Sequence, residues 1–191
     1  QGNEGSIWMG TDEGGIKNLT NNTIQAFTKK EGLPENQVLC VFEDKNGILW
    51  AGTAGAGLIK FNGSHFAHYS VNEGIPNNVT SIIQDDNGSY WFSSREGLTQ
   101  MQLTNNKAEF FTFTKDNGLL ESPITSLALD IDGNIWMGTE NGICRMETPE
   151  FEKAGPELEL KLQKYSEEDG LIDNHANSIC VDNEGRVWIG T

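Results

Sequence analysis

The sequence has little cysteine, little positive charge and no long hydrophobic run. Its three cysteines, Cys40, Cys144 and Cys180, lie far apart without a CxxC spacing, which argues against a disulfide framework and a zinc site. Lysine and arginine number 13 against 28 acidic residues, giving a formal net charge of −15. Nucleic-acid affinity comes mostly from clustered cations, so no nucleic-acid partner is expected. No apolar segment approaches the roughly 20 residues that span a bilayer, so no transmembrane helix is expected in this chain.

What the sequence does contain is one motif repeated five times. Each tryptophan has a glycine three residues before it, and four of the five are followed by Gly-Thr, which Ser93-Ser94 replaces once. The tryptophans are Trp8, Trp50, Trp91, Trp136 and Trp188, at spacings of 42, 41, 45 and 52 residues. A period in the forties with one tryptophan per repeat is typical of stacked β-sheet blades. The motif therefore predicts an all-β repeat protein.

The most regular repeat, residues 38–78, predicts four short strands. They cover residues 38–44, 48–53, 58–61 and 65–69, with turns at Asp44–Gly47, Ala54–Gly57 and Asn62-Gly63. Four strands joined by hairpins form an antiparallel meander, which cannot bury both of its faces alone. Successive sheets must therefore stack, and radial stacking around an axis is the β-propeller.

The same order of strands and turns recurs along the chain. The repeats cover approximately residues 1–37, 38–78, 79–123, 124–175 and 176–191. Counted against residues 38–78, the chain has a second to fourth strand at its N-terminus, three complete repeats, and a first and second strand at its C-terminus. About four blades are thus expected, as an open sector of a larger propeller. We expect this chain to be a piece of something longer, with its open ends covered by the remaining repeats or by a second copy.

One segment breaks the regular spacing. Residues 147–160 include two prolines and lengthen the last tryptophan spacing. They predict a loop enlarged between the third and fourth strands, after which Leu158, Leu160 and Leu162 resume the alternation of a strand.

Three stretches resemble the two-component regulator propeller repeats of bacterial hybrid histidine kinases. Val79–Asp85 resembles the start of the family repeat, Ile135–Thr139 with Gly142-Ile143 its middle, and Gly32–Asn36 its end. The resemblance implies an extracytoplasmic ligand-sensing segment of a sensor kinase, on the periplasmic or extracellular face of a bacterial inner membrane. It also implies a small polar ligand, commonly a glycan fragment, and no enzyme activity in this segment. Such sensors carry two propellers and a kinase, whereas about four blades are present here, so membrane contact is expected only through parts outside this chain.

The binding site is expected at one end of the blades. Because strand direction alternates, the turn after the second strand and the crossover after the fourth lie at the same end, and loops on a rigid scaffold commonly carry function. The candidate residues there are Asn36, Asn77, Asn78, Arg95, Glu96, Glu140, Asn141, Asn174 and His175. Amide and carboxylate groups suit sugar hydroxyls, but asparagine also serves turns. Arg95 could clamp a carboxylate or pair with Glu96 or Glu140.

Other residues invite a chemical interpretation that the pattern does not favour. The five tryptophans could stack on sugars, but their place in mid-strand favours packing between blades as structural repeat positions. His65 and His68 fall on the outer strand, where a solvated edge suits them. Asp130–Gly133 resembles the start of a calcium loop but lacks the later glutamate, so a hairpin turn is favoured and no metal or cofactor is expected.

Two other functions remain open. The strand Ile135–Thr139 followed by Glu140 is also similar to the repeats of streptogramin lyase-type propellers, which implies a magnesium-dependent enzyme using histidines on the central face. His175 is the one histidine placed there, which is thin support for proton transfer. The other possibility is a structural or protein-interaction propeller without a ligand of its own.

Overall fold

The structure is a computed structural model that describes residues 5–104, 107–147 and 160–191. Every described element is a β-strand or a single turn of 3-10 helix. The chain divides into two compact units, Gln1–Ile82 and Ile83–Thr191, which are treated separately below. No described helix is long and apolar enough to cross a membrane.

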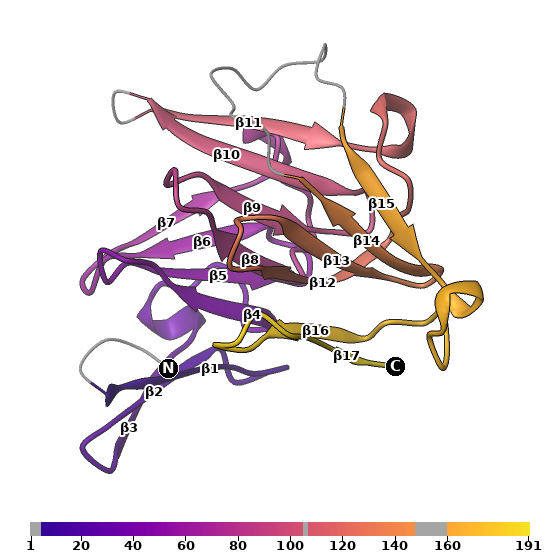
Figure 1. Cartoon of the computed structure of the whole chain (residues 1–191). Coiled ribbons are helices and arrows are strands. Elements are labelled where there is room, and N and C mark those ends of the chain that lie inside the picture. The colour runs from indigo at the N-terminus through magenta and orange to yellow at the C-terminus, as the bar shows by residue number, and fades with distance from the viewer. Residues whose placement is uncertain (1–4, 105–106, 148–159) are drawn as a thin grey trace. The chain divides into compact units, whose positions relative to one another are not determined.

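The N-terminal unit contains two antiparallel meanders (Figure 1). The first consists of β1 (Ile7–Gly10), β2 (Ile16–Thr20) and β3 (Thr23–Phe27). The second consists of β4 (Val38–Glu43), β5 (Leu49–Thr53), β6 (Leu58–Phe61) and β7 (Phe66–Tyr69). Each strand pairs with the next one in sequence, which is the order that the repeat predicts.

Two further meanders and a final hairpin make up the C-terminal unit, with β8 crossing the division between the units. One meander contains β8 (Ser81–Gln84), β9 (Tyr90–Ser93), β10 (Leu98–Thr104) and β11 (Lys107–Phe113). The next contains β12 (Ile124–Leu129), β13 (Ile135–Thr139), β14 (Gly142–Met146) and β15 (Leu162–Tyr165). The hairpin is β16 (Ser178–Val181) and β17 (Val187–Gly190).

The long insertion lies between a third and a fourth strand, β14 and β15, as its prolines and spacing predict. Leu160 and Leu162 pack against the core that contains Trp91, whereas Leu158 lies outside the described residues.

Four one-turn 3-10 helices, which the sequence analysis did not anticipate, follow the fourth strands. They are η2 (Lys29–Glu31), η3 (Val71–Glu73), η4 (Lys115–Asn117) and η5 (Glu167–Asp169). Three of them have a capping box, in which Thr28, Ser70 or Ser166 accepts from the turn and an acidic side chain accepts from the cap backbone. A glycine with positive φ ends each of these three turns, because a left-handed residue is needed there.

The indoles pack between neighbouring blades of each unit. In the N-terminal unit, Trp8 packs on the core formed by Leu49, Ala51, Ile59 and Phe61 of the next sheet. In the C-terminal unit, Trp91 lies among Ile135, Met137 and Met146, and Trp136 packs with Ile179, Val187 and Ile189. Burying a side chain of this size contributes several kcal/mol of stability, of order 3–5 per tryptophan. Trp188 is the exception. Its side chain is 56% exposed, so the prediction that all five tryptophans pack between blades is wrong for Trp188 in this structure.

The glycine two residues after the tryptophan allows the next blade to approach closely. A Cβ atom on Gly138 would lie 2.6 Å from Ser126 Oγ and 3.0 Å from the carbonyl oxygen of Ala176. On Gly10 it would lie 2.7 Å from Val38 Cγ1. These separations are too short for carbon, so a side chain at this position would push neighbouring strands apart.

Candidate functional site

Within each unit, the turns after the second strands and the crossovers after the fourth strands meet, and this end of the blades of a unit is called its loop face below. In the N-terminal unit, Gly15 N donates to Asn36 O at 3.0 Å and Gly55 N donates to Asn77 O at 2.9 Å. In the C-terminal unit, Gly142 N donates to Asn174 O at 2.7 Å. Backbone hydrogen bonds therefore hold each crossover against the turn of its own blade.

Two of the candidate asparagines hold the crossovers in shape. Asn36 Oδ1 accepts from Lys29 N at 2.9 Å, and Asn174 Oδ1 accepts from Glu167 N at 2.8 Å. Each side chain thus fixes the start of a 3-10 turn seven residues earlier. Asn77 is exposed, and the partly buried Asn78 forms an isolated bridge with Ala54. The turn role of asparagine that the sequence left open is therefore present at Asn36 and Asn174.

The candidate charges of the C-terminal unit lie on exposed turns. Arg95, Glu96, Glu140 and His175 are all exposed. Arg95 forms an ion pair with neither Glu96 nor Glu140 in the described structure. The backbone N–H of His175 donates to Asp173 Oδ1 at 2.7 Å, and both residues belong to the crossover before β16.

One pocket at this face brings two of the candidates together. It has a volume of about 630 Å³ and is called the loop-face pocket. It is lined by Glu121, Asn141, Lys164, Ser166, Glu167, Glu168 and Asn174. These residues come from the crossover before β12, the turn between β13 and β14, the end of β15, η5 and the crossover before β16. The candidates it contains are Asn141 and Asn174.

Glu121 is the centre of its polar network. Its carboxylate accepts from Lys164 Nζ at 2.6 Å, from Lys115 Nζ at 3.2 Å and from Asn141 Nδ2 at 3.2 Å. Its side chain is 14% exposed, and burial would by itself raise the pKa of this carboxyl. The hydrogen bonds from Lys164, Lys115 and Asn141 outweigh burial and hold the pKa below its ordinary value, so Glu121 is ionised.

The same contact stabilises the charge on Lys164. The hydrogen bond to Glu121 raises the pKa of Lys164 above its ordinary value, against a smaller effect of desolvation. Glu121 and Lys164 are therefore a charged pair at the pocket wall, joined across 43 residues of sequence.

The sequence analysis did not select Glu121, Lys164 or Lys115 as candidate residues. A signal for Lys164 was available. Cross-strand pairing places Leu162 opposite Met146 and Lys164 opposite Cys144, so both side chains lie on one face of β15. Leu160, Leu162 and Lys164 are alternate residues, so Lys164 follows two leucines that pack on the core. A lysine at such a position indicates that its ammonium group has a polar partner.

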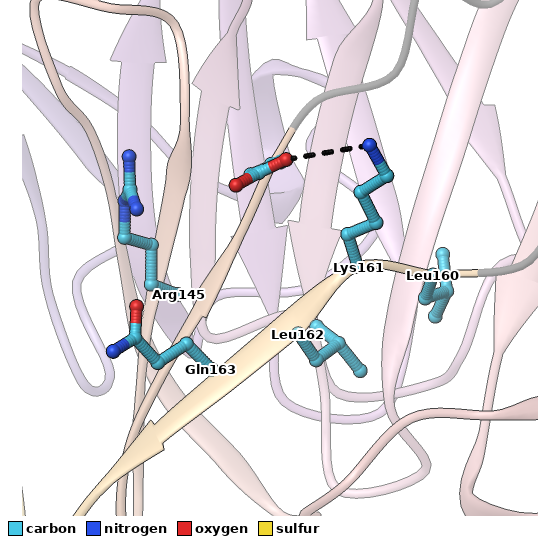
Figure 2. A pocket seen from close by; sticks show the side chains of 6 residues that line it. Arg145, Leu160, Lys161, Leu162 and Gln163 are labelled. Carbon is cyan, nitrogen blue, oxygen red and sulfur yellow. Dashed lines mark ion pairs between the residues drawn. The ribbon is translucent and has the colours of Figure 1, made fainter.

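A second pocket lies at the other end of β14 and β15 (Figure 2). It has a volume of about 480 Å³ and is lined by Arg145, Glu147, Leu160, Lys161, Leu162 and Gln163. Arg145 lies 3.7 Å from Asp130 Oδ2 and over the ring of Trp136, at 5.9 Å from its centroid. Lys161 and Glu147 form an ion pair at 3.8 Å, marked by the dashed line in Figure 2. None of the candidate residues lies here, and the described residues contain no group of three or more His, Cys, Asp or Glu placed to hold a metal ion.

Antiparallel four-stranded sheets that stack through their second-strand indoles define a β-propeller protein. Within this class, the repeats of the chain belong to the two component regulator propeller family. The sequence model of that family matches residues 32–55, 73–96, 118–141 and 170–191. Both the predicted fold class and the predicted family are confirmed. No curated protein matches the sequence.

Solved structures share the fold. The extracellular domain of the putative hybrid two component system BT3049 from B. thetaiotaomicron has a TM-score of 0.82 at 22% identity, over 100% of this chain and 26% of that one. The extracellular domain of the putative one component system BT4673 from the same organism has a TM-score of 0.77 at 21% identity, over 98% of this chain and 25% of that one. Virginiamycin B lyase from Staphylococcus aureus has a TM-score of 0.72 at 15% identity, and the match covers 98% of this chain and 60% of the lyase chain. The chain thus spans about a quarter of the length of each of these two extracellular domains.

Proposed function

We propose that this chain is an extracytoplasmic ligand-sensing segment of a two-component sensor histidine kinase, on the periplasmic or extracellular face of a bacterial inner membrane. The loop-face pocket would bind a small polar ligand such as a glycan fragment. The observation that carries the proposal is a polar pocket whose lining comes from five separate segments of the C-terminal unit. The family match and the likeness to extracellular domains of bacterial signalling systems support it.

The chemistry of the lining suits a polyhydroxyl ligand. Asn141 offers both amide donors and an acceptor, Lys164 offers donors, and the glutamates offer acceptors. A volume of about 630 Å³ falls within the roughly 300–1,000 Å³ of small-molecule sites. The backbone hydrogen bonds that join the crossovers to the turns fix these groups before a ligand arrives, which lowers the entropy lost on binding.

Thermal unfolding in the presence of a panel of oligosaccharides tests this proposal. A ligand that binds the folded chain should raise stability by about 2.7 kcal/mol at 100 times its dissociation constant. Asn141→Trp should block the pocket and abolish this gain, because Asn141 is exposed on a turn where a larger side chain can be accommodated.

Glu96→Trp is the matched control. The backbone N–H of Asn141 donates to Thr139 Oγ1, and that of Glu96 donates to Ser94 Oγ, so the two residues occupy equivalent turn positions. Loss of binding in Glu96→Trp but not in Asn141→Trp would move the site to the turn that carries Arg95. Unchanged unfolding curves with every oligosaccharide would favour a structural or protein-interaction propeller, whose partners would be the remaining repeats or a second copy.

The lyase alternative has its own test. Magnesium-dependent turnover of virginiamycin B or quinupristin, the compounds named with the lyase structures, that disappears in His175→Ala would support an enzyme and contradict the sensor proposal. Against the lyase, His175 is the one histidine carried by a loop-face turn or crossover. His65 lies in the turn before β7, and His68 lies on β7, where its Nε2 hydrogen-bonds to the carbonyl oxygen of Ala56 in a loop-face turn of the N-terminal unit.

A further inference from the structure

The loop-face pocket carries more negative than positive charge. Three carboxylates, those of Glu121, Glu167 and Glu168, line it together with the single ammonium group of Lys164. Lys115, 3.2 Å from Glu121, supplies a second ammonium group beside the lining. One negative charge is left in excess, and the chain as a whole adds a field of the same sign, with its formal net charge of −15.

Glu121 forms ion pairs with both lysines. The carboxylate lies between Lys164 and Lys115, at 2.6 Å and 3.2 Å, and only 14% of its side chain is exposed. Each lysine is thus engaged by the same carboxylate, and this group of three carries one net positive charge, fewer than the two negative charges of Glu167 and Glu168. A ligand carboxylate or sulfate would compete with Glu121 for these ammonium groups, and displacing Glu121 would leave it nearly buried without its counter-ions.

Glu167 and Glu168 are in the opposite situation. Neither forms an ion pair with a described residue, and both are exposed. Their backbone is held in place, because Glu167 N donates to Asn174 Oδ1 at 2.8 Å and Glu168 N donates to Ser166 Oγ at 3.3 Å. Two uncompensated carboxylates are thus carried on a fixed turn at the edge of the pocket.

Resting on the function proposed above, we propose that the loop-face pocket selects a glycan fragment with a free amino group over neutral and acidic fragments. The ammonium group of the sugar lies against Glu167 and Glu168, where charge-assisted hydrogen bonds are about twice as strong as neutral ones. The sugar hydroxyls reach Asn141 and the paired Glu121 and Lys164. A uronic acid is disfavoured because its carboxylate meets like charge.

Four β-1,4-linked disaccharides of similar shape test this selectivity by isothermal titration calorimetry. They are the glucosamine dimer, its N,N′-diacetylated form, cellobiose and cellobiuronic acid, measured at low salt with the sugar amine protonated. We expect the glucosamine dimer to bind about tenfold tighter than cellobiose or the acetylated dimer, with the uronic acid weakest. The advantage should shrink as salt is added, because exposed charges are screened.

Charge variants show whether Glu167 and Glu168 cause the preference. Glu167→Gln with Glu168→Gln should bring the affinities for the glucosamine dimer and cellobiose to within about twofold of each other. Asp132→Asn with Glu184→Gln is the matched control, since it removes the same charge from exposed hairpin turns of the same unit and should leave the preference intact. Lys164→Gln should enlarge the preference, because it adds to the negative excess.

The outcomes separate the two proposals. Equal binding of all four disaccharides, tighter binding of the uronic acid, or a preference that survives the double glutamine variant would overturn the charge selectivity and leave a sugar-binding pocket. Absence of binding by every disaccharide, in a chain whose far-ultraviolet circular dichroism shows it folded, would overturn the sugar-binding function and the selectivity with it.

Discussion

Trp136 donates its indole hydrogen to Asp130, with Nε1 2.8 Å from Oδ2, across the hairpin turn six residues earlier. The same bond joins Trp50 to Asp44, Trp91 to Asp85 and Trp188 to Asp182. Each of these aspartates also accepts backbone hydrogens of its turn, so one carboxylate fixes both the turn and the indole. Trp8 has a different partner, Glu43 of the next sheet, at 2.7 Å.

Removing this carboxylate should destabilise the blade. Asp130→Ala leaves the indole N–H of Trp136 and the backbone N–H groups of the turn without their acceptor, and we expect the free energy of unfolding to fall by about 2–3 kcal/mol. Asp132→Ala, in the same turn, removes an exposed side chain and should change stability by about 0.5 kcal/mol or less. Urea unfolding followed by tryptophan fluorescence measures both. Similar losses for the two variants would show that the indole bond does not stabilise the blade.

Acid should destabilise the C-terminal unit. Hydrogen bonds from Trp188 and then Arg186 lower the pKa of Asp182 from 3.8 to about 2. Burial alone would raise the pKa of Asp130, but hydrogen bonds led by Trp136 and Asn134 outweigh it and lower this pKa too. Because the folded chain holds both pKa values below those of the unfolded chain, their contribution is complete above about pH 5 and is lost as the pH falls through 3.8 toward 2.

Urea unfolding at a series of pH values tests this dependence. The free energy of unfolding should decrease between about pH 5 and pH 2.5, and Asp130→Asn should show a shallower decrease because one of the titrating groups is gone. A free energy that stays constant over this range in the parent chain would contradict the expected linkage.

A methyl group at Gly138 should disturb the contact between blades. In Gly138→Ala the new carbon would lie 2.6 Å from Ser126 Oγ and 3.0 Å from the carbonyl oxygen of Ala176, and we expect a loss of about 1–3 kcal/mol. Ser126→Ala alone should be nearly neutral, because Ser126 Oγ is buried without a hydrogen-bond partner in the described structure. The double variant should recover part of the loss, which a double-mutant cycle in urea would reveal as a coupling between the two sites. Strictly additive losses would mean that Ser126 is not the obstructing group.

Trp91 and Trp188 occupy the same position of the repeat but should make unequal contributions to stability. Trp91 is fully buried, so Trp91→Ala should cost about 3–5 kcal/mol. Trp188 is 56% exposed, so Trp188→Ala should cost about 1 kcal/mol or less, chiefly its bond to Asp182. Urea unfolding should be followed by circular dichroism, because each variant removes one of the tryptophans that a fluorescence measurement would report on. Comparable losses would show that Trp188 is buried in solution.

Local patterns predicted the strands and hairpins well because their causes are local. A turn needs a residue with positive φ, and Gly47, Gly88, Gly133 and Gly185 supply it at the same distance before each tryptophan. Alternation of side chains along a strand then decides which residues face a neighbouring sheet. The bond from the indole to the turn aspartate is also local, six residues long, and the constant Asp-to-Trp spacing could have predicted it.

The candidate site was harder to predict. The strand directions indicated which end would carry the loops, and Asn141 and Asn174 do line a pocket there. Arg95 was a candidate because it could clamp a carboxylate, yet it does not line that pocket. For Asn36 and Asn174 the sequence left a ligand role and a turn role open, and the turn role is present, because their side chains accept backbone hydrogens of η2 and η5.

The sequence by itself determined the blade: its strand order, its turns and the place of its indole, because each depends on residues within a few positions of one another. Only the tertiary structure decided that Glu121 meets Lys164, that Gly138 must lack a side chain beside Ala176, and that Trp188 stays exposed. Each of these depends on how closely segments 38 or more residues apart approach, or on whether a further sheet covers a face. The spacing of residues along the sequence does not determine how closely these segments approach, because the packing of whole sheets sets that distance.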